Sequence, residues 1–476
     1  MDATHERPRP AFCRLLALAL VVPAAACALD AKVPPAQAPT QAAWRAAQAA
    51  DAAAPAPAWW RSFGAPELDA LAEAALAGNL DIAAAVARIE QADAQARVAG
   101  APLLPALDLS TSASRSRAGG GSGSSRTANR YGLTLSASYE IDFWGKNRAG
   151  QRAAEWAAAA SRYDRETVAL SVAAGVAGAY LQILAAQDRL ETARGNLAIA
   201  QRALDAIRAR NTVGTATALD VAQQESIVLQ QRAAVPPLQQ QIRQNANALA
   251  ILAGRPPADL DVAGGGLRKV TVPAVAAGLP SELLTRRPDI RRAEAQLRAA
   301  EADVVAARAA LFPSIELTAA GGYQSAALGT LFGPGAALWS LAAGLTQPLF
   351  DGGRLEGQLE AQRARYVELL QSYRQAILSA FRDVEDALVA IEQTAQQETL
   401  QLAVVASARR AYDISAARLR EGTIDLLTLL NTQQTLFQAQ DQLAQIRLAR
   451  LQAVVGLYQA LGGGWDGTLP GAPVPQ

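Results

Sequence analysis

Histidine and cysteine are the side chains that most readily supply acid–base, nucleophilic and metal-binding groups near neutral pH. This chain of 476 residues has one histidine, His5, and two cysteines, Cys13 and Cys27. His5 and Cys13 fall within residues 1–26, which we interpret below as a signal peptide that is removed. The mature chain would then have no imidazole, and its single thiol could not form an intrachain disulfide. We therefore expect no enzymatic activity, no metal site and no cofactor.

The first 26 residues have the three parts of a secretory signal peptide. A basic region with Arg7, Arg9 and Arg14 precedes the apolar run 15–22, and small residues follow up to Ala26. Such a run is too short to span a bilayer. The sequence therefore predicts an exported protein whose mature chain begins near Cys27.

Cys27 at the first mature position resembles the cysteine of a bacterial lipobox, whose thiol is acylated. Ala24 stands where leucine is usual, and the three alanines before Cys27 also fit an ordinary cleavage site. Two outcomes follow, a lipid-anchored terminus or a plain exported one. An exposed free thiol is a liability, which favours lipidation of Cys27.

The rest of the composition indicates long packed helices. Net charge is +1 and aromatic residues make up 5% of the chain, so a nucleic-acid partner is not implied. Alanine-rich helices can approach one another closely, and no run of eighteen apolar residues follows the signal, so we expect no membrane-spanning helix. Proline-rich residues 27–65 are predicted to form an N-terminal linker, and residues 463–476 a C-terminal tail.

Four stretches alternate apolar and polar residues with period two, which predicts strands that have one apolar and one wet face. They lie near residues 106–114, 131–143, 314–324 and 338–349. Strands of about ten residues with aromatic side chains near their ends are typical of outer-membrane barrels.

Four strands cannot close into a barrel, and an open edge in hydrocarbon leaves backbone groups unpaired. Other copies of the chain would have to complete the sheet. Two copies would give eight strands and a bore filled by side chains, whereas three would give twelve and a water-filled lumen. The alternative is a soluble sandwich with these strands as its core.

The chain also contains an internal repeat with a constant offset of 208 residues. The matching landmarks are Asp81 and Asp289, Pro105 and Pro313, Gly145 and Gly353, Gly214 and Gly422, Leu249 and Leu457, and Gly254 and Gly462. We predict a first repeat over residues 66–262 and a second over residues 274–462. Each is expected to contain a helix, two strands, a long helix, a tight turn and a returning helix.

The elements of the repeats differ in how clearly the sequence marks them. Residues 66–99 are predicted to form one helix. The Gly- and Ser-rich residues 114–130 are predicted to form a solvated extracellular loop, and so are residues 326–335 in the second repeat. Two long helical hairpins are predicted over residues 148–253 and 355–461. A helix of sixty-odd residues reaches about 90 to 100 Å.

The hairpins are predicted to reverse at Gly214-Thr215 and at Gly422-Thr423. Glycine allows the positive φ that such turns require. Pro236-Pro237 has no counterpart in the second repeat, so we expect a kink or break in the first returning helix.

The order of several motifs resembles the outer membrane factor family, the TolC-like exit ducts, and in particular its efflux-lipoprotein branch. The residues that carry this resemblance are Trp59-Trp60 with Phe63, Asn79-Leu80-Asp81-Ile82, Tyr139 to Gly145, Arg286 to Ile290, Leu311-Phe312-Pro313 and Gln347 to Gly353. They extend over nearly the whole mature chain.

The resemblance implies a homotrimer with a twelve-stranded transmembrane β-barrel, four strands from each chain, continued by a periplasmic α-helical barrel. It further implies an outer-membrane exit duct for small molecules, powered by an inner-membrane transporter. A periplasmic adaptor would contact the tips at Gly214, Thr215, Gly422 and Thr423 and open the duct. A duct for protein secretion and a non-channel periplasmic coiled-coil protein remain as alternatives.

The resemblance also places a gate near the tips. Asp220 stands where relatives have an aspartate of the closing latch, whereas Thr428 and Asn431 stand where they have acidic rings. Our hypothesis is that Asp220 pairs with Arg418 or Arg420 of a neighbouring helix and that Asn431 lines the constriction. Asp220 could equally act only as a favourable charge at its helix N-terminus. Other charged residues that crowd the same turn are Glu421 and Asp425.

Overall fold

The computed structural model describes residues 30–45, 55–119 and 125–465, and it divides into two compact units. The strand unit comprises residues 95–154 and 298–367 together with the segment that ends at Pro34. The helix unit comprises residues 35–94, 155–297 and those after 367. The predicted signal peptide, Cys27 and residues 466–476 of the predicted tail lie outside the described residues.

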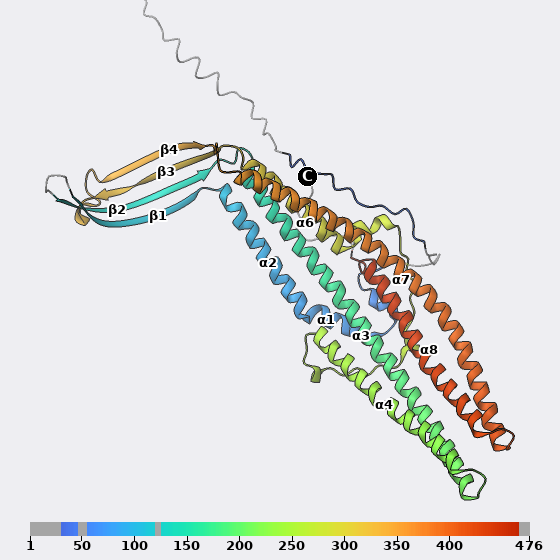
Figure 1. The fold of residues 1–476 in the computed structure, drawn as a ribbon. Coiled ribbons are helices and arrows are strands. Elements are labelled where there is room, and N and C mark those ends of the chain that lie inside the picture. Colours follow the sequence, from blue (N-terminus) through green and yellow to red (C-terminus); the bar gives the residue numbers. More distant parts are fainter. Residues whose placement is uncertain (1–29, 46–54, 120–124, 466–476) are drawn as a thin grey trace, which may run out of the picture. The chain divides into compact units, whose positions relative to one another are not determined.

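The strand unit contains one antiparallel sheet in the order β1-β2-β3-β4 (Figure 1). The strands are β1 (Ala106–Gly119), β2 (Ser125–Glu140), β3 (Ser314–Ser325) and β4 (Ala337–Thr346). Both β1 and β4 have one edge without a partner strand in this sheet. A soluble sandwich would need two stacked sheets, so the described residues do not form the alternative core that the sequence left open.

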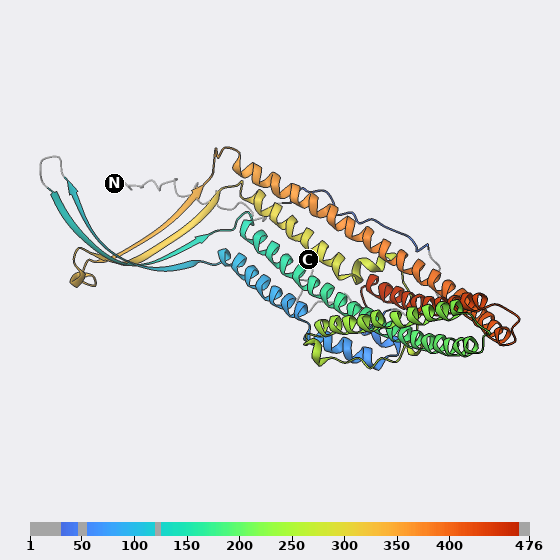
Figure 2. The same ribbon diagram turned by 60° about the horizontal axis from the view of Figure 1, so that its bottom comes forward.

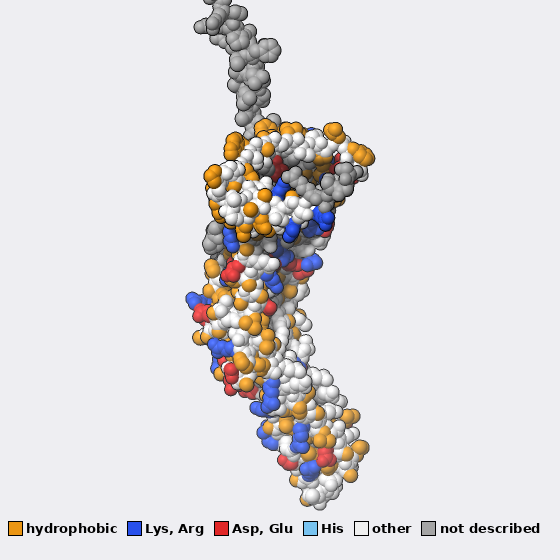
Figure 3. Space-filling view, turned by 90° about the vertical axis from the view of Figure 1, so that its left-hand side faces the viewer, with side chains coloured by type: hydrophobic (Ala, Val, Ile, Leu, Met, Phe, Trp, Pro, Cys, Tyr) orange, Lys and Arg blue, Asp and Glu red, His pale blue; other side chains and the backbone are white. Residues whose placement is uncertain are grey.

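The sheet is curved, and its two faces differ in chemistry. Odd-numbered residues such as Leu109 and Leu135, which lie opposite each other, form an apolar face, and even-numbered residues such as Asp108 and Ser136 form a polar one. Hydrophobic side chains gather on the outer side of the curve, and the hollow contains charged side chains of both signs (Figure 3). This arrangement matches a barrel wall that faces lipid outside and water inside.

The predicted loop at residues 114–130 is wrong, because β1 and β2 continue through most of it as a regular ladder from Ser114↔Arg130 to Gly119↔Ser125. Serine and arginine alternate here without an apolar face, so hydrophobic periodicity gave no strand signal. Figure 2 shows this hairpin reaching beyond the ends of β3 and β4.

At the other end of the sheet, the strands are shorter than predicted. β2 ends at Glu140 because Asp142 accepts hydrogen bonds from the backbone N–H groups of Asn147 and Arg148, at 2.9 Å each, and so caps the next helix. β4 ends at Thr346, two residues before Pro348, which has no N–H to donate to a ladder.

Two long helical hairpins make up most of the helix unit, and each pairs a long helix with a shorter returning one (Figure 2). They consist of α3 (Lys146–Thr212) with α4 (Ala218–Leu252), and of α7 (Arg354–Arg420) with α8 (Leu426–Ala460). The long helices have 67 residues each and the returning helices 35 each. Every one of these boundaries differs by 208 between the repeats.

The remaining helices are shorter. They are α1 (Pro66–Gly78), α2 (Leu80–Gly100), α5 (Leu283–Arg286), α6 (Pro288–Ala309) and the 3-10 helices η2 (Trp59–Phe63), η3 (Ala101–Leu103), η4 (Pro257–Asp259), η5 (Leu267–Lys269), η6 (Pro280–Glu282) and η7 (Leu328–Thr330).

The predicted single helix at residues 66–99 is wrong, because Asn79 is extended (φ −67°, ψ 130°) and separates α1 from α2. Its side-chain oxygen accepts from the N–H groups of Asp81 and Ile82. Helical periodicity continues across such a break, so it did not reveal the cap.

Of the kink or break expected at Pro236-Pro237, the break is wrong, because α4 is a single helix through both prolines. Each proline removes a backbone donor. α4 is nevertheless held against α3 by buried contacts, which include Val228 packed with Ala200 and Leu204. Tertiary packing supplies most helix stability in proteins, so it can outweigh this loss.

Two helical stretches of the described chain, Pro66–Leu103 and Lys146–Thr212, are apolar enough to cross a membrane by length and composition alone. The expectation that no helix spans the membrane stays a prediction, since length and composition alone do not test it. In the second stretch, 56% of the apolar window is buried inside the fold. Core helices of soluble domains meet the same criterion, so composition does not distinguish a membrane-spanning helix from a buried core helix here.

Part of the predicted linker is folded onto the chain. In η2, Trp59, Trp60 and Phe63 are buried. In the segment 30–45, Trp44 packs edge-on against Phe381 and donates from Nε1 to the carbonyl of Gly278 at 2.8 Å. The prolines and polar residues around these aromatics are typical of a linker. The few buried aromatic rings are nevertheless enough to keep these residues packed on the helices.

The two repeats meet their neighbouring elements through the same contacts. Asn79 donates from Nδ2 to the carbonyl of Leu252 at 2.9 Å, and Arg287, its counterpart, donates from Nη1 to the carbonyl of Ala460 at 3.1 Å. Each bond satisfies a carbonyl at the C-terminal end of a returning helix, which has no partner within that helix.

A glycine follows the end of each returning helix and allows close packing there. Gly254 and Gly462 have φ values of +67° and +87°. A Cβ at Gly254 would collide with the carbonyl oxygen of Gly78, and one at Gly462 with that of Arg286. These positions require glycine for both backbone conformation and space.

We predict that Gly254→Ala lowers the free energy of unfolding by at least about 2 kcal/mol, because the positive φ and the backbone collision both disfavour a Cβ. Guanidinium unfolding of the detergent-purified protein, followed by helical circular dichroism, measures this change. Gly456→Ala is the control, since Gly456 lies inside α8 and a Cβ there meets nothing within 4 Å. Equal midpoints for the two variants would contradict the role given to Gly254.

Candidate functional site

The two hairpin tips have the same hydrogen-bonded turn. Thr215 donates from its N–H and its hydroxyl to the carbonyl of Arg210, at 2.9 and 3.0 Å. Thr423 donates in the same way to the carbonyl of Arg418, at 3.0 and 3.1 Å. The preceding glycines, at positions 214 and 422, have φ values of +75° and +73°. A left-handed glycine followed by such a bond is a common way to end a helix.

A polar cap then starts each returning helix. Thr217 and Asp220 form a reciprocal capping box at α4, in which the Asp220 carboxylate accepts from the N–H of Thr217 at 2.7 Å and from its hydroxyl at 2.9 Å. At α8, Asp425 accepts from the N–H of Thr428 at 2.9 Å and from its hydroxyl. These donated hydrogen bonds lower the pKa of Asp425.

The capping box gives Asp220 a structural role within one chain. Among the ion pairs found in the described residues, none joins Asp220 to Arg418 or Arg420. The helix-end role that the sequence left open is thus present. A carboxylate has about four acceptor positions, so the cap does not use up its capacity for a second partner. Pairing of Asp220 with an arginine of a neighbouring copy stays a prediction.

The other predicted gate residues lie near the tips but do not form one cluster with Asp220. Arg418, Arg420, Thr428 and Asn431 are exposed on the single chain. The guanidinium Nε of Arg420 donates to the carbonyl of Ala416 on its own helix at 3.2 Å. Their exposure leaves these side chains available to another chain.

Sequence reasoning missed the residues that join the two hairpins. Arg210, the repeat counterpart of Arg418, donates to the carbonyl of Leu419 at 3.2 Å. An apolar cluster of Ile207, Leu426, Leu429 and Leu430 lies beside it, with Leu419 packed against the cluster. The 208-residue offset could have identified Arg210, because it relates this residue to a predicted gate residue.

Ion pairs join the same helices farther from the tips. Arg189 of α3 pairs with Asp441 of α8, at 2.6 and 3.2 Å. Glu398 of α7 accepts from Arg447 and Arg450 of α8, at 3.0 and 2.8 Å. Burial alone would raise the pKa of Glu398, but the two arginines hold it below its usual value. These pairs fix the helices that present the tips.

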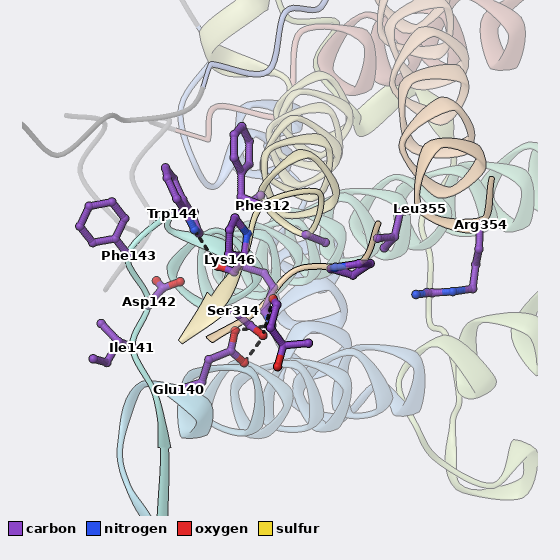
Figure 4. Close-up of a pocket in the computed structure, with 15 residues that line it drawn as sticks. Glu140, Ile141, Asp142, Phe143, Trp144, Lys146, Phe312, Ser314, Arg354 and Leu355 are labelled. Carbon is purple, nitrogen blue, oxygen red and sulfur yellow. Dashed lines mark hydrogen bonds and ion pairs between the residues drawn. The ribbon is translucent and has the colours of Figure 1, made fainter. Parts of the chain in front are cut away.

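A cavity of about 180 Å³ lies in the strand unit, where β2 and β3 meet the adjoining helix ends (Figure 4). Trp144 stacks on Phe312 with ring centroids 4.7 Å apart, and its Nε1 donates to the carbonyl of Pro313 at 2.8 Å. Lys146 pairs with Glu140 at 2.6 Å. These contacts use side chains of two motifs quoted above, and they anchor the ends of the strands.

Nothing in the described residues resembles a catalytic or metal centre. No group of three or more His, Cys, Asp or Glu side chains in this part of the chain is placed to hold a metal ion. The candidate functional features in this part of the chain are the two-faced sheet and the two tips with the same turn.

Comparison with known proteins agrees with this arrangement. The family model described as outer membrane efflux protein matches residues 71–255 and 279–463, one match in each repeat. The chain is 46% identical over 417 residues to the pyoverdine export outer membrane protein OpmQ of Pseudomonas aeruginosa, covering 86% of this chain and 87% of that protein. It is 36% identical over 468 residues to the toluene efflux pump outer membrane protein TtgF of Pseudomonas putida, covering 95% and 97%.

Solved channels share the fold. The outer-membrane channel OprN superposes with a TM-score of 0.86 at 28% identity, over 91% of this chain and 99% of that chain. The open state of the Neisseria gonorrhoeae MtrE outer membrane channel gives 0.82 at 31% identity, over 92% and 98%. The predicted fold class, a trimeric twelve-stranded barrel with four strands per chain and a helical continuation, is confirmed. The alternative of a non-channel coiled-coil protein is wrong, since the chain belongs to the outer membrane efflux protein family.

Proposed function

We propose that three copies of this chain form a passive duct that carries small molecules from the periplasm, through the outer membrane, to the exterior. The observation that carries the proposal is the curved four-stranded sheet, which is apolar outside and polar inside and has two unpaired edges. Three such sheets would give a closed twelve-stranded barrel with a wet lumen. The helical hairpins would extend this lumen into the periplasm.

Energy and opening would come from partners, because the described residues contain no catalytic or nucleotide-binding centre. We assign export energy to an inner-membrane transporter and opening to a periplasmic adaptor that contacts the tips at Gly214, Thr215, Gly422 and Thr423. The shared turn geometry supports this, since one type of adaptor element could fit both tips.

Two leucines beside the tips give the adaptor an apolar contact. Leu219 and Leu427 are repeat counterparts in the first turns of α4 and α8, and they are 65% and 55% exposed. Leucine side chains at matching positions of two polar tips are suited to bury apolar area against a partner.

The gate follows from the charges around the same tips. Asp220 of one copy would pair with Arg418 or Arg420 of the next, while Thr428 and Asn431 would line the constriction. Asp425 stays a cap of α8 next to this latch. The unused acceptor positions of Asp220 and the exposure of both arginines support this arrangement.

A lipid anchor at Cys27 fits the strand unit. Asp30, three residues later, accepts a hydrogen bond on its carbonyl from Arg308, near the end of α6. This contact holds Asp30 at the helix end that leads into β3, in the same unit as the strands that would face lipid.

Small organic molecules are the favoured cargo over secreted proteins. The relatives named above are described by export of pyoverdine and of toluene, both small molecules. The greater identity to the pyoverdine exporter makes a siderophore of that kind a second, narrower candidate. Restoration of pyoverdine export in a strain that lacks its own duct would favour it, whereas restored solvent tolerance without pyoverdine export would leave the broader proposal alone.

The tip contact predicts that Leu219→Glu with Leu427→Glu lowers the tolerated drug concentration at least about tenfold in cells that depend on this duct, because charge replaces the apolar contact. Leu229→Glu is the matched control, since Leu229 is 56% exposed on α4 but lies away from the tip. Heat-sensitive trimers in outer-membrane fractions should be equally abundant in all variants. Full tolerance in the tip variant would exclude these leucines from adaptor contact.

The latch predicts that Asp220→Asn increases the closed-state current of single channels in planar bilayers, because asparagine keeps the cap but loses the charge. Thr217→Ala provides the complementary control, since it weakens the cap and leaves the Asp220 carboxylate in place. If only Thr217→Ala alters the current, Asp220 acts as a helix cap and the latch is wrong.

The anchor predicts that Cys27→Ala abolishes incorporation of labelled palmitate while trimers still form. Mass spectrometry of the mature N-terminus provides an independent measurement. A labelled Cys27→Ala protein, or an unmodified cysteine in the wild type, would refute lipidation at this residue.

A further inference from the structure

The edge strands β1 and β4 must meet between copies if the barrel closes. They are antiparallel to each other across the sheet, so β4 of one copy can pair with β1 of the next. From the internal repeat, we infer the residue-by-residue register of this contact. The inference rests on the trimer proposed above and adds to it the pairing between its copies.

The two hairpins of the sheet show that the repeat preserves register. Ala106 lies opposite Ser138 in the first hairpin, and Ser314 lies opposite Thr346 in the second. Both residues of the second pair are 208 positions after their counterparts. The repeat is therefore structural as well as sequential in the strands.

The junction between repeats is seen once within the chain, where β2 meets β3. Glu140 lies opposite Glu316 there, and the N–H of Ile141 continues the ladder by donating to the carbonyl of Ile315 at 2.9 Å. A ring of three chains contains six repeats and six such junctions. If the junctions are alike, the contact between β4 and the next β1 has the register of β2 with β3.

Translating this register by the repeat gives the contact between copies. Adding 208 to each β2 position and subtracting 208 from its β3 partner converts the pair Ser138↔Thr318 into Thr346↔Ser110 of the next chain. Likewise, Ser136↔Ala320 becomes Gly344↔Ser112. In this register the residue numbers of every pair add up to 456.

The observed strand lengths agree with this register. All ten residues of β4, Ala337–Thr346, find partners in Ser110–Gly119 of the next chain, and Ala337 meets the last residue of β1. This accounts for the extension of β1 beyond its predicted end at residue 114. The added residues are those that a neighbour needs to satisfy the outer half of β4.

The outward side of the same contact suits an interface with lipid. Trp339, which is 83% exposed on one chain, comes opposite Arg117 of the next. Tryptophan and arginine side chains are favourable at the boundary between hydrocarbon and water, and a guanidinium can lie over the indole face. Small residues, Gly344 and Ser112, face the lumen closer to the helices.

Cross-linking of paired cysteines tests the register. The Ile141 bond shows that odd-numbered positions form the hydrogen-bonded pairs at this junction, so even-numbered pairs have their Cα atoms closer together, at about 4.5 Å. We therefore choose Gly344→Cys with Ser112→Cys. A Cβ at Gly344 meets nothing within 4 Å in its own chain.

Serines two positions to either side of Ser112 provide matched controls. Gly344→Cys is combined with Ser110→Cys or with Ser114→Cys. Opposite residues have Cβ atoms about 4.5 to 5.5 Å apart and diagonal ones about 7 to 8 Å, whereas a disulfide requires about 3.5 to 4.5 Å. Under a mild oxidant, the Ser112→Cys variant should form at least about five times more boiling-resistant, reducible oligomer than either control.

Ser136→Cys with Ala320→Cys supplies the positive control, because these residues lie opposite each other within one chain at the equivalent junction. When this disulfide forms, neither cysteine reacts with a maleimide label, so the loss of labelling measures the bond. A native trimer that cross-links best through Ser110→Cys or Ser114→Cys overturns the register, as does one that forms no link while the positive control does. A chain that runs as a monomer overturns the proposed trimer as well.

Discussion

Every backbone N–H and C=O group placed in hydrocarbon must have a hydrogen-bond partner within protein, since each unpaired group costs several kcal/mol. This chain satisfies that constraint for the three internal seams of its sheet and leaves it unsatisfied at the free edges of β1 and β4. The membrane wall is therefore completed by other copies. Assembly is thus a condition for the barrel's stability in lipid.

In the two repeats, the carbonyl at the end of the returning helix accepts a hydrogen bond from two chemically different side chains. In the first repeat, the neutral amide of Asn79 satisfies the end of α4, and in the second the guanidinium of Arg287 satisfies the end of α8. A buried charge requires compensation. Arg287 obtains it from Asp289, at 2.7 Å, and from Asp383, at 3.3 Å. Burial would raise the pKa of Asp289, but the bonds and charge of Arg287 lower it below its usual value.

The main architecture could be predicted from the sequence because it rests on long periodic signals. The alternating strands, the two hairpins and the repeat each extend over many residues, and the tip glycines mark positions that need a positive φ. Asn79 and Pro236 show the limits of this reasoning. A single side-chain cap interrupts a helix without altering its periodicity, and packing against another helix keeps α4 intact through a residue that usually breaks one.

Less of the candidate site could be predicted from the sequence, because its contacts are not local. Local sequence places Asp220 and Asp425 at helix starts, and the capping bonds follow from that placement. Contacts between hairpins, such as Arg210 with the carbonyl of Leu419, join residues about two hundred positions apart. No local pattern encodes such a contact. The proposed latch and adaptor surfaces would involve other chains, so neither sequence periodicity nor one chain's contacts can define them.

The packed segment at residues 30–45 has a consequence for the order of folding. Tyr366 donates to the carbonyl of Pro34 at 3.0 Å, and Glu385 accepts from Gln41 at 2.8 Å, so residues more than 330 positions apart are joined. Export and synthesis proceed from the N-terminus, and contacts between distant residues form late because of the entropy of loop closure. The segment at residues 30–45 therefore packs only after the chain has been made and exported as far as α7. Its docking on α7 marks the completion of a protomer.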